Sequence, residues 1–205
     1  MDHAELVSCI KELKMPSVLE YFTDYSEQAG KEQWSFERYL YELLNIEQEN
    51  RKERRIRKLL RESKLPLSKT LDMLDRTRFQ RTINGQIEAL IEGSFLNRYE
   101  NVLVFGNPGA GKSHTLCAIG HELVLQGHRV LFKNCEILVQ ELLSAKRELI
   151  LPALLRKLGR YEGLIVDDIG YVQQSREEME VLFTLLADRY ERASTMITSN
   201  LPFSK

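Results

Sequence analysis

A glycine-rich segment at residues 106–113 carries the clearest chemical signal in the sequence, because it matches G-x-x-x-x-G-K-[S/T] at every fixed position. Its glycines lack a Cβ, so successive backbone N–H groups can curve around phosphate oxygens. The helix expected to follow adds unpaired N–H groups and the positive end of its dipole. The segment therefore predicts a site for ATP. The expected nucleotide contacts are Gly106, Asn107, Pro108, Gly109, Ala110, Gly111, Lys112, Ser113 and the adjacent His114.

Two side chains of this segment and two acids further on can do the chemistry. Lys112 is expected to reach the β- and γ-phosphates, and Ser113 to ligate Mg²⁺. Asp167 and Asp168 follow an apolar stretch at residues 164–166, which predicts a strand ending at the ligand-binding edge of a parallel sheet. We expect Asp167 to hold the Mg²⁺ and Asp168 to act as general base toward the attacking water. An Asp-Asp pair is also common in helix caps and surface turns. The phosphate-binding loop (P-loop) at residues 106–113, earlier in the chain, favours the catalytic interpretation.

Asn200 comes shortly after a further predicted strand, at residues 195–198. If this predicted strand lies between the strands that precede the P-loop and the acidic pair, the amide reaches the γ-phosphate side. A neutral amide can orient water there without repelling phosphate. The alternative is an ordinary Asn in a strand-to-loop turn.

Short apolar strands and amphipathic helices alternate after residue 71, which is the pattern of βαβ units. The predicted strands are at residues 101–105, 130–132, 164–166 and 195–198. Apolar residues at helical spacing occur at residues 83–91, 116–123, 137–143 and 179–186. This pattern predicts an α/β fold of the P-loop NTPase type, in which helices cover both faces of a parallel sheet.

The first 65 residues favour helix, and Pro16 is their only proline. Ser35 is a plausible N-cap for a long helix that Pro66 would stop. We expect a small all-helical domain at residues 1–65 and the ATPase core at 66–205, with a linker at 64–71.

The formal net charge of −1 hides a strong polarity along the chain. Residues 1–49 hold 4 basic and 11 acidic side chains, whereas residues 50–64 hold 8 basic and 2 acidic ones. A basic stripe on one helix side suits the phosphate backbone of double-stranded DNA. Pairing with the acidic segment and plain solvation are the alternatives. The predicted DNA contacts are Arg51, Arg54, Arg55, Lys58 and Arg61; a second, weaker basic cluster is Lys146, Arg147, Arg156, Lys157 and Arg160.

Several classes are excluded by composition. No apolar run approaches the ~20 residues that span a bilayer, and the acidic N-terminus does not resemble a signal peptide, so we expect a cytoplasmic protein. Three cysteines without a close pair argue against disulfides and a zinc site. The histidines at 114, 121 and 128 are too far apart on a helix to share a metal.

The motifs together resemble the IstB-type transposition helper ATPases, relatives of the DnaC helicase loaders in the AAA+ group. The resemblance rests on residues 101–114, 164–171 and, most specifically, 189–203. It makes residues 106–113 the Walker A motif, Asp167 and Asp168 the Walker B acids, and Asn200 sensor I. It implies an ATPase that assembles on double-stranded DNA as an ATP-dependent homo-oligomer and assists a transposase.

Two alternatives stay open: a loader acting on a replicative helicase, and a scaffold that binds ATP without hydrolysing it. A small-molecule P-loop kinase fits less well, because the basic helix and Asn200 would then have no role. Family members continue past Lys205 into an arginine finger, sensor II and a helical lid. Nucleotide binding by this chain is therefore better supported than turnover.

Overall fold

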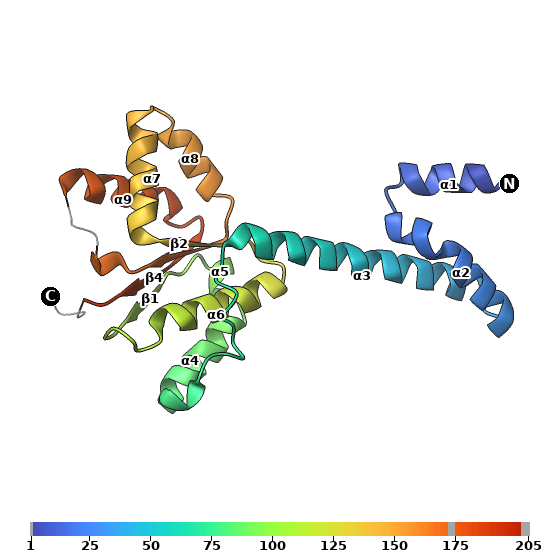
Figure 1. Cartoon of the computed structure of the whole chain (residues 1–205), viewed down its shortest axis with the longest axis horizontal. Coiled ribbons are helices and arrows are strands. Elements are labelled where there is room, and N and C mark those ends of the chain that lie inside the picture. Colours follow the sequence, from blue (N-terminus) through green and yellow to red (C-terminus); the bar gives the residue numbers. More distant parts are fainter. Residues whose placement is uncertain (1, 172–174, 202–205) are drawn as a thin grey trace. The chain divides into compact units, whose positions relative to one another are not determined.

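The computed structural model describes residues 2–171 and 175–201 (Figure 1). The chain divides into two compact units, residues 1–57 and residues 58–205. Pro202 and Phe203, which end the stretch behind the family resemblance, lie outside the described residues.

The first unit is helical, as the sequence predicts. It contains α1 (His3–Glu12), α2 (Pro16–Glu32) and most of α3 (Phe36–Ser63) (Figure 1). Asp2 and Glu5 form a capping box on α1, and Pro16 occupies the first turn of α2, where its missing N–H costs nothing. Ser35 Oγ accepts a hydrogen bond from Arg38 N at 3.2 Å, which confirms the predicted N-cap. Ile10, Val18 and Leu43 form the small core of this unit.

Glu47 is a buried acid that ties α3 to the start of α2. Its carboxylate accepts hydrogen bonds from Ser17 N at 2.7 Å and Val18 N at 3.3 Å. It also pairs with Arg51 at 2.7 Å and Arg54 at 3.2 Å. Burial pushes the pKa of Glu47 up, but the bonds from Arg51, Ser17 and Val18 outweigh burial and leave this pKa below its usual value. Two cations of the basic stripe are therefore already engaged with an acid.

Replacing Glu47 with Ala should destabilise the first unit by about 1.5–3 kcal/mol, the range for hydrogen bonds to a charged group. Because the folded pKa lies below the unfolded value of about 4.3, the stabilisation is full above that pH and is lost as pH falls through the folded pKa. Urea unfolding followed by the fluorescence of Trp34, the only tryptophan, measures both effects. Glu49→Gln, on an exposed position of the same helix, is the control. An unchanged midpoint for Glu47→Ala would contradict the assignment.

The second unit contains a parallel sheet of four strands, in the order β1-β4-β3-β2 (Figure 1). The strands are β1 (Val102–Phe105), β2 (Val130–Asn134), β3 (Gly163–Asp167) and β4 (Ser194–Ser199). The last strand in the sequence thus inserts between the strands that carry the P-loop and the acidic pair. This order confirms the condition on which the role of Asn200 depends.

Helices cover both faces of this sheet, which confirms the predicted fold class. On one face, α4 (Arg81–Ile91) and α6 (Lys112–Leu125) pack with Ile165 and Met196. On the other, α7 (Cys135–Arg147), α8 (Leu151–Leu158) and α9 (Arg176–Arg189) pack with Leu164 and Val166. Neighbouring residues of β3 therefore serve opposite cores. The remaining elements are α5 (Ser94–Asn97) and the 3-10 turns η1 (Arg76–Arg78) and η2 (Ile169–Tyr171).

The chain is divided into its two compact units after residue 57, whereas the predicted domain boundary is at residue 65. Leu59 and Leu65 are buried in the core that contains α6, so the end of α3 packs with the second unit. The predicted linker is also held in place. His121 Nε2 donates to the carbonyl of Pro66 at 3.1 Å, and His114 Nε2 donates to that of Thr70 at 2.9 Å. The predicted linker is therefore attached to α6 by hydrogen bonds, whereas its turn-forming residues predict a segment without such contacts.

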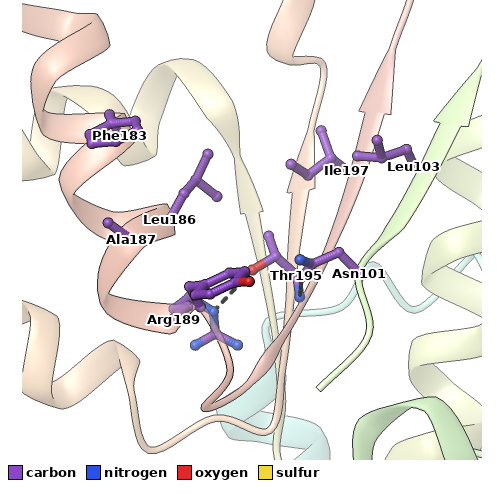
Figure 2. A pocket seen from close by; sticks show the side chains of 9 residues that line it. Asn101, Leu103, Phe183, Leu186, Ala187, Arg189, Thr195 and Ile197 are labelled. Atoms are coloured by element: carbon purple, nitrogen blue, oxygen red, sulfur yellow. Dashed lines mark hydrogen bonds between the residues drawn. The ribbon is translucent and has the colours of Figure 1, made fainter. Parts of the chain in front are cut away.

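Arg189 anchors the end of α9 through hydrogen bonds to neutral oxygens and forms no salt bridge in the described part of the chain. It is 2% exposed and donates to the carbonyls of Leu158, Tyr161 and Ser194 and to Thr195 Oγ1. Burial lowers the pKa of Arg189 to about 10. Figure 2 shows its bond to Thr195 beside a cavity of about 550 Å³ that α9, β1 and β4 line. Arg189 thus replaces solvent as the donor for three buried carbonyls.

None of the helices in the described ranges is long and apolar enough to cross a membrane.

Candidate nucleotide-binding site

The loop after β1 has the backbone that phosphate binding requires. Gly109 and Gly111 adopt φ of +78° and +87°, the left-handed region in which a Cβ is strained. Gly111 caps α6 without a side-chain hydrogen bond, so the first turn keeps donors available for a ligand. The helix dipole adds positive potential at the same point.

This loop lines a cavity of about 430 Å³, and most of the predicted site residues lie on the lining of the same cavity. The end of β4 contributes Asn200 and the end of β3 contributes Asp168. The cavity is lined by Arg78, Pro108, Gly109, Gly111, Lys112, Ser113, His114, Asp168 and Asn200. Asn107, Ala110 and Asp167 lie next to lining residues in the chain, and Gly106 lies two positions before Pro108; none of the four is on the lining itself. Arg78 is the one lining residue that the motifs do not indicate.

Lys112 is buried, and its ammonium has three oxygen partners. Nζ donates to the carbonyls of Gly106 at 2.8 Å and Asn107 at 3.0 Å, and to the amide oxygen of Asn200. No carboxylate neutralises Lys112 among the described residues. Its charge is therefore held at the P-loop by neutral acceptors, which a phosphate oxygen can replace.

The two acids are held by a residue that sequence analysis did not single out. Thr198, fully buried in β4, donates from Oγ1 to Asp167 Oδ1 at 2.6 Å and accepts from Asp168 N at 2.8 Å. No signal in the sequence distinguishes it, because β4 also holds hydroxyl residues at Ser194, Thr195 and Ser199. Asp168 adopts φ of +62°, which turns the chain out of the strand direction immediately after Asp167.

Asn200 connects the P-loop to the second acid. Its Nδ2 donates to Asp168 Oδ1 at 3.2 Å while its Oδ1 accepts from Lys112 Nζ. The strand order explains this contact: β4 lies between β1 and β3, and because the strands are parallel the chain leaves all three at one edge of the sheet. The structure therefore brings Lys112, Asp168 and Asn200 together, as the strand pattern predicts.

Ser113 and Asp167 have the donor chemistry for Mg²⁺, which keeps several waters and takes one or two protein oxygens besides phosphate. Ser113 lines the cavity, and the Asp167 oxygen that does not face Thr198 has no hydrogen bond within the described residues. The pair therefore fits the ion. Among the described residues, no cluster of three or more His, Cys, Asp or Glu could hold a metal by itself.

One histidine and two buried cysteines lie in or near the site. His114 lines the cavity and its Nε2 donates to the carbonyl of Thr70, so its contact with the nucleotide stays a prediction. Burial raises the pKa of the Cys117 thiol to about 12 and that of Cys135 to about 11. Both thiols are free of disulfides, and at neutral pH both are protonated and unsuited to nucleophilic attack.

The predicted DNA contacts lie on α3 and are exposed. Arg51 and Arg54 bind Glu47, and Lys58 lies 3.9 Å from Glu62. In the second basic cluster, Lys146 pairs with Glu180 at 2.9 Å. The exposed members of this cluster are Arg147, Arg156, Lys157 and Arg160, and Leu149 between them is 89% exposed.

The parallel sheet, the glycine loop and the residues at its mouth define a P-loop nucleotide-binding protein. A family model described as IstB-like ATP binding protein matches residues 8–205. The chain belongs to this family.

Two relatives agree with this assignment. A protein of Sinorhizobium fredii named as an insertion sequence ATP-binding protein is 39% identical over 206 residues, which cover 100% of this chain and 69% of the relative. The corresponding protein of insertion sequence IS21 from Pseudomonas aeruginosa is 37% identical over 201 residues, which cover 98% of this chain and 76% of the relative.

Solved structures confirm the AAA+ fold. DnaA from Aquifex aeolicus, bound to AMPPCP, has a TM-score of 0.60 at 19% identity, covering 69% of this chain and 44% of that chain. A DnaC helicase loader has a TM-score of 0.54 at 23% identity, covering 60% of this chain and 71% of that chain. At such identities the likeness concerns the fold alone.

Proposed function

We propose that this protein is an ATP-dependent helper that assembles as a homo-oligomer on double-stranded DNA and assists a transposase in the cytoplasm. The observation that carries the ATP site is the cavity in which Lys112, Asp168 and Asn200 converge beside the P-loop. The transposase as partner is supported by relatives whose names place them in insertion sequences.

The side chains have distinct roles in the proposed hydrolysis of ATP to ADP and phosphate. Lys112 exchanges its neutral acceptors for the β- and γ-phosphates, and its charge offsets the charge that develops on them. Asp168 accepts the proton of the attacking water, and Asn200, bonded to Asp168, orients that water. Ser113 and Asp167 would hold Mg²⁺, which neutralises phosphate charge when bound.

Turnover in such assemblies needs a further cation from a neighbouring copy, worth about 10³–10⁵ in rate in related enzymes. Hydrolysis should therefore depend on assembly, whereas nucleotide binding should not.

Size measurement by light scattering tests the proposed assembly. The protein is mixed with duplex DNA, with and without a slowly hydrolysed ATP analogue. A large complex that requires both duplex and nucleotide supports the proposal, whereas a monomer under every condition would refute it. The motif resemblance that extends to the DnaC helicase loaders leaves one second candidate, a helicase loader. Capture of a transposase or of a replicative helicase from the native host separates the two functions.

We propose the five α3 cations as the DNA contacts, and Lys58 and Arg61 test the proposal without disturbing Glu47. The double change Lys58→Glu and Arg61→Glu should weaken duplex binding at low salt and lower the slope of log affinity against log salt by about 2. Fluorescence anisotropy at several salt concentrations measures both quantities.

The matched control reverses two exposed cations of the second basic cluster, Arg156→Glu with Lys157→Glu. If only this control pair changes affinity and slope, the DNA surface lies on α8 and the assignment to α3 is wrong.

A further inference from the structure

A cation outside the P-loop motif lines the nucleotide cavity. Arg78, in the 3-10 turn η1, shares that lining with Lys112, Asp168 and Asn200. Its side chain is exposed and has no hydrogen bond or salt bridge within the described residues. The pKa of Asp75 lies below its usual value mainly because Thr77 donates hydrogen bonds to it, and Arg78 contributes only a weaker attraction. The five N–H donors of this guanidinium are thus available to a ligand.

The segment that carries Arg78 is fixed against the P-loop helix. We call residues 66–79 the strap. His121 and His114 donate to strap carbonyls, and a Cβ at Gly111 would lie 3.3 Å from Cζ of Phe79. Phe79 is the residue after Arg78, so the packing of its ring on the P-loop glycine places Arg78 at the cavity. Its position follows from these contacts rather than from a free loop.

Arg76, two residues earlier in the same turn, has a structural role that contrasts with that of Arg78. Its Nε donates to Asn84 Oδ1 at 3.2 Å, and its guanidinium pairs with Glu88 at 2.5 Å. Arg76 therefore holds η1 to α4. Arg78 has no equivalent partner among the described residues, which makes Arg76 a matched control for it.

The charges around the cavity indicate which kind of ligand Arg78 would bind. The Lys112 ammonium and the Asp168 carboxylate, both on the lining, oppose each other in charge. A polyphosphate needs a net positive surrounding, and a planar guanidinium matches the paired oxygens of a phosphate group. We propose that Arg78 is a second phosphate-binding cation of the nucleotide site, reaching the polyphosphate from the strap. This role rests on the ATP site proposed above.

Binding of ATP, ADP and AMP to Arg78→Gln tests the role, with isothermal calorimetry as the readout. We expect ATP affinity to fall about 10-fold, ADP affinity by less and AMP affinity least, because charged hydrogen bonds to phosphate are lost. Arg78→Lys should recover part of the loss. Arg76→Gln should leave the affinity ratios of the three nucleotides unchanged.

Three results would overturn the role of Arg78: unchanged ATP affinity, an equal loss for all three nucleotides, or the same pattern of loss for Arg76→Gln. An equal loss would indicate a contact with the base or ribose. Lys112→Ala, measured in parallel, separates this inference from the site on which it rests. If Lys112→Ala binds ATP normally, the ATP site is wrongly placed; if it loses ATP while Arg78→Gln does not, only the role of Arg78 fails.

Discussion

Lys112→Ala should lower ATP affinity by about 10²–10³-fold, because each hydrogen bond to a charged group is worth ~1.5–3 kcal/mol and more than one is lost. Lys112 is the buried cation at the P-loop, and its present partners are neutral oxygens. No other cation of the motif can replace it. Assembly on DNA that depends on nucleotide should disappear with binding.

Titration with a fluorescent ATP analogue measures this loss, and Lys157→Ala, which removes an exposed lysine from α8, is the control. Thermal unfolding without nucleotide shows whether the variant is folded. A folded Lys112→Ala protein that binds ATP as tightly as the parent would refute the site.

Asp168→Asn should leave ATP binding intact and reduce turnover by about 10²–10⁴-fold, the range for losing a general base. The substitution is isosteric, and the new amide oxygen can still accept the bond from Asn200 Nδ2 that the structure shows at 3.2 Å. Geometry is therefore kept, while the group that takes the proton from water is removed. Phosphate release with duplex DNA and ATP gives the rate, and the fluorescent analogue gives the affinity.

Asp188→Asn, at the end of α9, controls for the loss of one negative charge. Two outcomes would contradict the prediction. Unchanged phosphate release would remove Asp168 from catalysis, and a parent protein that never releases phosphate on DNA would refute the ATPase.

The periodicity of apolar residues predicted the architecture because it indicates which faces of the helices and strands are buried. The alternation of strands and helices gave the parallel α/β class, and the motif spacing identified Lys112, Asp168 and Asn200 as neighbours in space. Spacing cannot show which hydrogen bonds form across strands, so the role of Thr198 between Asp167 and Asp168 was missed.

Contacts between residues far apart in the sequence explain the other differences between the predicted and the observed structure. Arg51 and Arg54 belong to a basic stripe when counted along the helix, yet both bind Glu47, which is anchored to Ser17 about thirty positions earlier in the chain. Residues 64–71, which include the start of the strap, were expected to be a linker because they contain Pro66 and polar residues. The attachment of this segment to α6 depends on His114 and His121, whose spacing in the sequence carries no indication of that contact.

The three hydrogen bonds of the Lys112 ammonium favour the binding of anionic ligands over uncharged ones. Each N–H already has an oxygen acceptor, so a sugar hydroxyl or an amide that entered would only exchange one neutral acceptor for another. An anionic oxygen adds the Coulomb attraction between its own charge and the ammonium, so it is the kind of group for which that exchange is favourable. Selectivity for polyanions over the many neutral metabolites of a cell would then begin with the contacts that the lysine makes before any ligand arrives.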